Sequence, residues 1–318
     1  MNHLSLKRLT TFLFAPLALF LIGGATTCRA DNSQLLAPPP IHRHVDRAVA
    51  DSEGPYFDLP VIYNSKVKNW IRFFQGPGRH DYKIWLDRSY RYLPRITPVL
   101  VDRGLPRDLA YLAMIESGFS QFAVSQADAV GPWQFMKSTA QHYGLHINWW
   151  IDERRDIVKS TVAAAAYLNH LHRMFHSWYL AAAAYNMGER RVKNLIQRYH
   201  TNNYWILSKK REFPSETEQY IPKLIAAMLI AKAPGLYGFR NLSPMPPERY
   251  DIFYAPGGTD LETLALYLGL PRNALTRLNP EIVKGFIPHF VHRFRIRLPQ
   301  GELVKARRFA ESRLVMSD

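Results

Sequence analysis

Apolar residues along most of the chain follow the spacing of helices. Val67, Ile71 and Phe74 recur at intervals of four and three residues, which places them on one helical face. Glycine, proline and capping residues divide the later pattern into segments, with Pro94 opening one of them and Ser138 capping another. We therefore expect further helices over residues 82–90, 94–104, 106–116, 138–144, 160–175, 178–186, 189–199 and 219–233.

The pattern changes near residue 250, where short strand-like runs first occur. Residues 250–254 and 294–298 are predicted as strands, and residues 261–268 and 272–278 between them as helices. The expected fold class is therefore mainly α, with a small β-α-α-β module after a larger helical body.

The first thirty residues have the pattern of an export signal. Lys7 and Arg8 precede an apolar run over residues 12–25, and small residues follow that run. The run is shorter than the roughly 20 apolar residues that a bilayer span needs, which argues against a retained anchor. Cleavage before Asp31 would release the protein, whereas cleavage before Cys28 would leave a lipid on that cysteine. The residues before Cys28 match the lipoprotein pattern poorly, which favours release.

Composition shifts suggest where the domains begin and end. A polar, proline-containing linker follows the signal, and prolines at residues 244–247 mark a second break. We expect the helical body to stay folded and active when residues 250–318 are removed, because it has a core of its own. The predicted parts are a signal peptide at 1–30, a linker at 31–58, the helical domain at 59–243, the module at 250–301 and a C-terminal tail at 302–318.

The chain is strongly basic, with 41 Lys and Arg against 26 Asp and Glu and a formal net charge of +15 at pH 7. Residues 1–30 carry Lys7, Arg8 and Arg29 and no acid, so their removal lowers the charge only to +12. This balance indicates a polyanionic partner or an anionic surface. Cys28 is the one cysteine, which excludes an internal disulfide and a cysteine-based zinc site.

Glu116 is the first candidate for chemistry. Leu109, Leu112 and Ala113 precede it by seven, four and three residues, so a carboxyl group shares a helical face with apolar side chains. A carboxyl group in such surroundings loses hydration, and its pKa rises toward the range of a general acid. The alternative is an ordinary ion pair of Glu116 with Arg107 or Arg154.

The residues around Glu116 form a set of motifs in a fixed order. Ser125 follows Glu116 by nine residues, and the sequence Gly-Pro-Trp-Gln-Phe-Met occupies 131–136. Ala-Tyr-Asn-Met-Gly follows at 184–188, and Glu-Thr-Glu-Gln-Tyr-Ile-Pro at 216–222. Taken together, these motifs resemble the lysozyme-like lytic transglycosylases of bacterial cell walls, and in particular the membrane-bound murein transglycosylase D group. A lysozyme-like helical domain is the fold that this resemblance implies.

The resemblance implies one catalytic carboxyl group where ordinary glycosidases use two. Glu116 would act first as acid and then as base, and the 6-hydroxyl of muramic acid would attack to give a 1,6-anhydro sugar. Asp128 is the best second carboxyl group, although a solvent-exposed loop residue is the simpler interpretation. Asp152, Glu153 and Asp156 are expected to pair with neighbouring arginines or to cap the next helix.

The same resemblance assigns substrate contacts. Ser125 would hydrogen-bond the N-acetyl group, Gln134 and the Gly131 backbone would line the central sugar sites, and Met136 would pack against sugar. Tyr185 would reach Glu116 or the sugar beside it, Asn186 would fix that loop, and Tyr220 would lie near Glu116 as well. Read from spacing alone, Tyr185 could equally be a core aromatic residue.

The C-terminal module resembles a LysM glycan-binding unit. The shared features are Asp-Leu-Glu-Thr-Leu-Ala at 260–265, Leu-Asn-Pro at 278–280 and Arg-Leu-Pro-Gln-Gly at 297–301. The start of the module departs from the LysM pattern, with Pro-Gly-Gly-Thr-Asp at 256–260. A purely structural module is therefore the alternative.

Several other functions are disfavoured. His172 and His176 share a helical face, but no His-Glu-x-x-His arrangement or third ligand accompanies them, so we expect neither a metal nor another cofactor. The basic residues are spread along an exported chain, which argues against nucleic acid. The expected partner is the peptidoglycan strand, in the periplasm or cell envelope, with attachment to the membrane surface and oligomeric state left open. A hydrolytic muramidase and a catalytically idle glycan-binding protein remain as alternatives.

Overall fold

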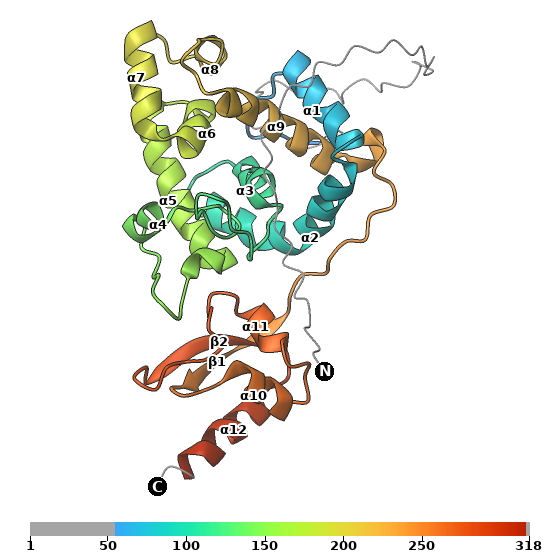
Figure 1. The fold of residues 1–318 in the computed structure, drawn as a ribbon. Coiled ribbons are helices and arrows are strands. Elements are labelled where there is room, and N and C mark those ends of the chain that lie inside the picture. Colours follow the sequence, from blue (N-terminus) through green and yellow to red (C-terminus); the bar gives the residue numbers. More distant parts are fainter. Residues whose placement is uncertain (1–54, 316–318) are drawn as a thin grey trace, which may run out of the picture.

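The computed structural model describes residues 55–315 (Figure 1). The predicted signal peptide at 1–30, the cleavage and lipid site at Cys28 and nearly all of the linker at 31–58 lie outside the described residues. Within the described part, helices form a body, and a small module that contains the two strands follows it (Figure 1).

The body is built from α-helices joined by loops of different length. Three 3-10 turns, at Arg107–Leu109, Glu153–Arg155 and Pro234–Tyr237, interrupt these connections. The helices are α1 (Ser65–Gln75), α2 (Arg79–Val101), α3 (Ala110–Ser117), α4 (Lys137–His142), α5 (Ile157–Phe175), α6 (Trp178–Met187), α7 (Glu189–Tyr199), α8 (Tyr204–Leu207) and α9 (Ser215–Lys232).

Local side-chain chemistry explains where α1 and α3 begin or end. At the start of α1, Asn64 Oδ1 accepts a hydrogen bond from Val67 N at 3.0 Å. α3 ends at Gly118, whose φ of 59° lies in the left-handed region. A Cβ atom on Gly118 would lie 2.2 Å from the Trp85 ring, so glycine suits both the backbone and the packing there.

α2 continues through Pro94 and Pro98, so the predicted separate helix starting at Pro94 is wrong. A proline inside a helix removes one backbone hydrogen bond and costs on the order of 3 kcal/mol. Tyr92, Ile96 and Leu100 of the same helix are buried, and their burial offsets that cost. Tertiary packing therefore overrides the local signal at Pro94.

Other helix starts also differ from the predictions. α4 has Met136 as its N-cap residue without a side-chain cap bond, so Ser138 does not cap it. α5 begins earlier than predicted, because Asp156 Oδ1 accepts hydrogen bonds from two backbone N–H groups of its first turn, at 2.8 and 2.9 Å. α9 also begins earlier, at Ser215, and the sequence pattern does not predict α8.

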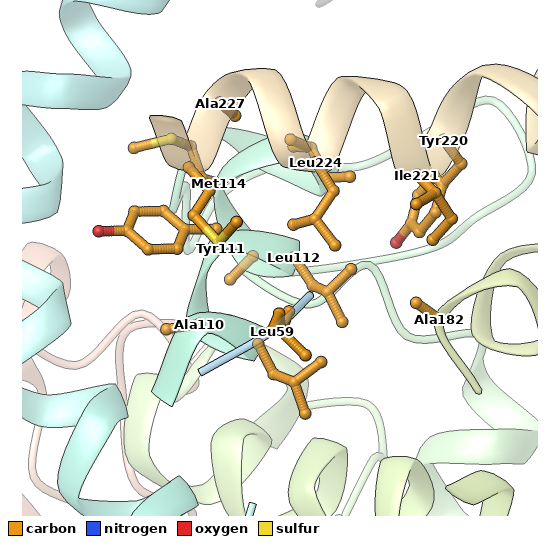
Figure 2. Packing of buried hydrophobic residues seen from close by; sticks show 14 of the residues in the cluster. Leu59, Ala110, Tyr111, Leu112, Met114, Ala182, Tyr220, Ile221, Leu224 and Ala227 are labelled. Carbon is orange, nitrogen blue, oxygen red and sulfur yellow. The ribbon is translucent and has the colours of Figure 1, made fainter. Parts of the chain in front are cut away.

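The core of the body fixes α3 against α9. Residues 110–115 of α3 are all buried, and α9 buries most of its side chains as well. Figure 2 shows Ile221 and Leu224 of α9 pointing toward α3, beside Leu112. α2 joins them through Tyr82, whose hydroxyl donates to the carbonyl oxygen of Ala227 at 2.6 Å. The last turn of α3 is therefore held in place by an element that is far away in the sequence.

The module has the predicted β-α-α-β order. β1 and β2 pair antiparallel, with Phe253 opposite Ile296. The pattern does not predict the final helix, which lies within the expected tail and buries Ala306 and Phe309 against the module. The elements are β1 (Tyr250–Pro256), α10 (Leu261–Tyr267), α11 (Ala274–Leu278), β2 (Arg293–Pro299) and α12 (Leu303–Val315).

The module and the body share one segment of chain. Trp150 and Ile151, from the body, belong to the buried core of the module. Arg297 of β2 is 4% exposed and donates to Asp156 Oδ2 at 2.8 Å and to Glu281. Removing residues 250–318 would leave Asp156 without its cation and would expose Trp150 and Ile151. The expectation that the body stays folded and active without residues 250–318 stays a prediction, and these contacts predict that the deletion lowers the stability of the body.

Candidate active site

Glu116 lies in the last turn of α3, half-buried, with α9 beside it. The Tyr220 hydroxyl, from α9, donates to Glu116 Oε1 at 2.5 Å across 104 residues of sequence. Arg107 and Arg154 instead pair with other carboxylates, so the alternative of an arginine ion pair for Glu116 is wrong. A phenol and not a guanidinium is therefore the direct partner of this carboxyl group.

Burial raises the pKa of Glu116 from 4.5 to about 7. The hydrogen bond from Tyr220 and the positive charge of Lys223 lower this pKa, and the charge of Glu216 raises it, but burial has the largest effect. Lys223 follows Tyr220 on α9 and donates to the carbonyl oxygen of Ile115 at 2.9 Å. A pKa near 7 leaves a large fraction of the carboxyl groups protonated at neutral pH.

Tyr185 of α6 faces the same carboxyl group. Burial raises its pKa well above 10, and the charge of Glu116 raises it further. The Tyr185 hydroxyl donates to the carbonyl oxygen of Trp133 at 2.7 Å. Its neighbour Asn186 accepts from Thr217 Oγ1 at 2.6 Å, which ties α6 to the first turn of α9. Tyr185 is therefore a hydrogen-bonded link between the site and the loop before α4.

That loop, residues 118–136, carries the other predicted contacts. Ser125 Oγ accepts from the backbone N–H groups of Ala127 and Ala129 at 3.2 and 3.0 Å, which leaves its hydroxyl hydrogen free to donate elsewhere. Gln134, with a φ of 48°, donates from its amide to the Gly131 carbonyl oxygen at 2.9 Å. Met136 is 45% exposed.

Two further side chains join the loop to its surroundings. Ser117 Oγ, next to Glu116, donates to the Pro132 carbonyl oxygen at 2.8 Å. Arg154 Nη1 donates to the carbonyl oxygens of Asp128 and Phe135, each at 3.0 Å. These contacts bring the loop to the end of α3.

Gly131 shows how closely the loop packs on the segment that contains Arg154. It has a φ of 83°, and a Cβ atom there would lie 2.0 Å from the Arg154 carbonyl oxygen. No other residue fits without moving the backbone. The sequence predicts Arg154 only as an ion-pair partner, and its bond to Asp152 at 2.8 Å agrees with that prediction. Nothing in the sequence pattern indicates that Arg154 also hydrogen-bonds the backbone of the loop.

Within residues 55–315, no second carboxyl group is buried beside Glu116. Asp128 is exposed in the loop, in agreement with the simpler interpretation. The carboxyl group whose charge does reach Glu116 is Glu216, which is exposed in the first turn of α9. The sequence motif includes Glu216, but periodicity alone could not relate it to Glu116.

Residues 102–208 match the family model described as the transglycosylase SLT domain. This part of the chain is similar to the transglycosylase SLT domain. The matched range includes Glu116, the loop at 118–136 and the pair Tyr185–Asn186, whereas Tyr220 lies beyond it. The resemblance to the lytic transglycosylases is confirmed, and so is the mainly α fold class.

Relatives of known name resemble a region wider than the SLT domain. The membrane-bound lytic murein transglycosylase D of Escherichia coli (strain K12) is 39% identical over 192 residues, which are 59% of this chain and 41% of the relative. The chain thus aligns with less than half the length of that relative.

Solved structures are similar at lower identity. The lytic transglycosylase Slt of Pseudomonas aeruginosa, in an inactive variant, is 22% identical with a TM-score of 0.42, covering 55% of this chain and 28% of its own. The 70 kDa soluble lytic transglycosylase of Escherichia coli is 19% identical with a TM-score of 0.40, covering 54% of this chain and 31% of its own.

Among residues 55–315, no three or more His, Cys, Asp or Glu side chains gather in a way that could hold a metal ion. The His172 ring stacks on Trp178 at 3.8 Å between centroids. In the same described part, no helix is both long enough and apolar enough to cross a membrane.

Proposed function

We propose that this protein is a peptidoglycan lytic transglycosylase that cleaves the β-1,4 bond between N-acetylmuramic acid and N-acetylglucosamine. The observation that carries the proposal is a half-buried Glu116 whose pKa is raised to about 7 inside an SLT domain. Such a carboxyl group can hold a proton at neutral pH and can also take one back after releasing it.

In the proposed reaction, Glu116 donates its proton to the glycosidic oxygen as the bond from that oxygen to C1 of the muramic acid breaks. The resulting carboxylate then accepts the proton of the 6-hydroxyl group on the same sugar. The oxygen of that hydroxyl bonds to C1, which closes a 1,6-anhydro ring and restores protonated Glu116. No water is consumed, so a second carboxyl group to activate water is not required.

The surrounding residues fit supporting roles in this reaction. The free hydroxyl hydrogen of Ser125 is available for the N-acetyl oxygen, and Gln134 with the Gly131 backbone would line the central sugar sites. Exposed Met136 would pack against sugar. The pKa of Tyr220 is raised by burial and by Glu116, so its phenol stays protonated and donates to the carboxyl group. Tyr185 and Asn186 would position the loop and α9 around it.

The place of action that fits is the cell envelope, either in the periplasm or at the membrane surface through Cys28. There the basic surface would face the carboxylates of wall peptides and acidic wall polymers. The LysM-like module would add a second glycan contact to the same strand.

Digestion of purified sacculi, with mass spectrometry of the products, tests the proposal. The expected products carry 1,6-anhydro ends, and Glu116→Gln forms none. Reducing ends from the wild-type protein would instead identify a hydrolytic muramidase, and Glu216→Gln and Asp128→Asn would then show which carboxyl group activates water. Binding to sacculi without any cleavage would identify an idle glycan-binding protein.

A further inference from the structure

An open pocket of about 260 Å³ lies where the helical body meets the module, away from Glu116. We call it the junction pocket. Its lining includes Arg91 and Tyr92 of α2, Phe122 of the loop at 118–136, Arg249 before β1 and Arg277 of α11. Pro299 of β2 lines it as well, so five separate stretches of the chain contribute to one opening, and three of them belong to the module or to its connection.

The charges around the junction pocket are strongly unbalanced. Arg91 pairs with the one carboxylate in its lining, Glu248, at 3.3 Å. Arg249 and Arg277 are exposed, and their guanidinium groups form no hydrogen bond or ion pair within residues 55–315. An adjoining opening of about 430 Å³ shares Arg249 and Glu248 and adds Arg95. Four arginines therefore surround a single acid, and two of them are available to an anion from outside.

One wall of the junction pocket is formed by Gln121 and Phe122, which belong to the loop at 118–136 of the candidate site. Gln121 is buried, accepts from the Tyr92 hydroxyl at 3.2 Å and donates to the Arg155 carbonyl oxygen at 3.1 Å. The next residue, Phe122, is 54% exposed and precedes Ser125 by three positions. The loop that is proposed to hold the sugar thus also forms one side of the basic pocket.

We propose that the junction pocket binds the carboxylates of the peptide stems attached to the glycan strand, an inference that rests on the proposed function. A guanidinium group binds a carboxylate through two parallel hydrogen bonds, and the guanidinium donors of Arg249 and Arg277 have no partner within residues 55–315. Tyr92 and Phe122 supply an apolar wall for small side chains of a peptide. The pocket makes the protein prefer strands that still carry peptides over bare glycan.

The test compares the wild-type protein with a double variant, Arg249→Ala and Arg277→Ala. A matched control, Arg190→Ala with Arg191→Ala, removes the same charge from exposed positions on α7. Binding is measured at one fixed salt concentration to intact sacculi and to sacculi stripped of peptides by an amidase, and the ratio of the two affinities is reported. Thermal unfolding checks that each variant is folded.

The wild-type protein should bind intact sacculi better than stripped ones, and the double variant should lose about tenfold of that preference, because charge-assisted hydrogen bonds are lost. The control should keep the wild-type ratio. An equal drop in the control, or an unchanged ratio in the double variant, overturns the inference. Competition by a phosphate-bearing wall polymer but not by free stem peptide would also overturn it.

The binding ratio does not depend on cleavage. If the wild-type protein leaves sacculi uncut, the proposed function fails while the ratio still decides the role of the junction pocket. If the wild-type protein cuts sacculi and the ratio is unchanged in the double variant, only the junction pocket is refuted.

Discussion

Replacing Glu116 by Gln should abolish cleavage and at the same time stabilise the protein at alkaline pH. Glutamine is nearly the same size but cannot donate a proton, so turnover should fall by at least about 10²- to 10⁴-fold. In the wild-type protein a pKa of about 7 leaves the acid form as the major species at pH 6 and the minor one at pH 8. A step limited by this acid should therefore slow by about tenfold between those two pH values.

The effect on stability follows from the same pKa shift. The pKa of Glu116 is raised from 4.5 to about 7 in the folded protein, so below 4.5 the group is neutral in both states and carries no penalty. As pH rises from 4.5 to about 7, the unfolded chain loses its proton first, and the folded protein is destabilised relative to it. Above about 7 the penalty is constant, and for this half-buried group it is at most about 3 kcal/mol.

Thermal unfolding of both proteins at pH 5 and pH 8 measures this difference. Glu116→Gln should gain stability over the wild-type protein at pH 8 and much less at pH 5, while sacculus digestion detects no anhydro products. Asp128→Asn is a matched control, because it removes an exposed carboxyl group from the same site. A difference between Glu116→Gln and wild type that does not change with pH would refute the account of a dehydrated acid, and turnover within about tenfold of wild type would refute its catalytic role.

Three further substitutions test the neighbouring contacts. Tyr220→Phe removes a hydrogen bond that favours the charged carboxylate, so the pKa of Glu116 should rise and the fall in the pH–rate profile should move to higher pH. Asp128→Asn should leave the rate of anhydro product formation within about threefold, as expected for an exposed acid. Arg297→Leu leaves the buried carboxylates of Asp156 and Glu281 without their arginine partner, and it should lower the unfolding free energy by about 3–5 kcal/mol in denaturant titrations. Arg293→Leu, at the exposed end of the same strand, is the control and should lower it little.

Local patterns in the sequence predict most of the helices, because the buried face of a helix repeats every three or four residues and a capping side chain bonds a backbone N–H group two or three residues away. Val67, Ile71 and Phe74 are buried on one face of α1, as their spacing predicts. The prediction fails at Pro94, where packing of the whole helix outweighs one lost hydrogen bond. It also misses α8, which spans only four residues and is too short for a helical period to appear.

The candidate site depends on pairings that no local pattern contains. Tyr220 and Glu116 are 104 positions apart, and their proximity could be expected only from the family resemblance. The loop contacts of Arg154 are even less visible, since its neighbour Asp152 already accounts for its charge. The pairing of Arg297 with Asp156 spans 141 residues and joins two parts that the sequence suggests are independent.

Glu116, the proposed proton donor, and the loop at 118–136 are held in part by different contacts. The pKa of Glu116 is set by its burial against α9 and by Tyr220 and Lys223 of that helix. The loop at 118–136 is held by Ser117 and Tyr185 and also by Arg154, whose segment is tied to the module through Arg297. A change in α9 should therefore move the pH dependence, whereas Arg297→Leu should weaken substrate binding and leave the pH midpoint unchanged. The module thus supports the loop through Arg297 and the segment that contains Arg154. The contribution of the module to activity should therefore persist on soluble glycan fragments, where attachment to the wall has no effect.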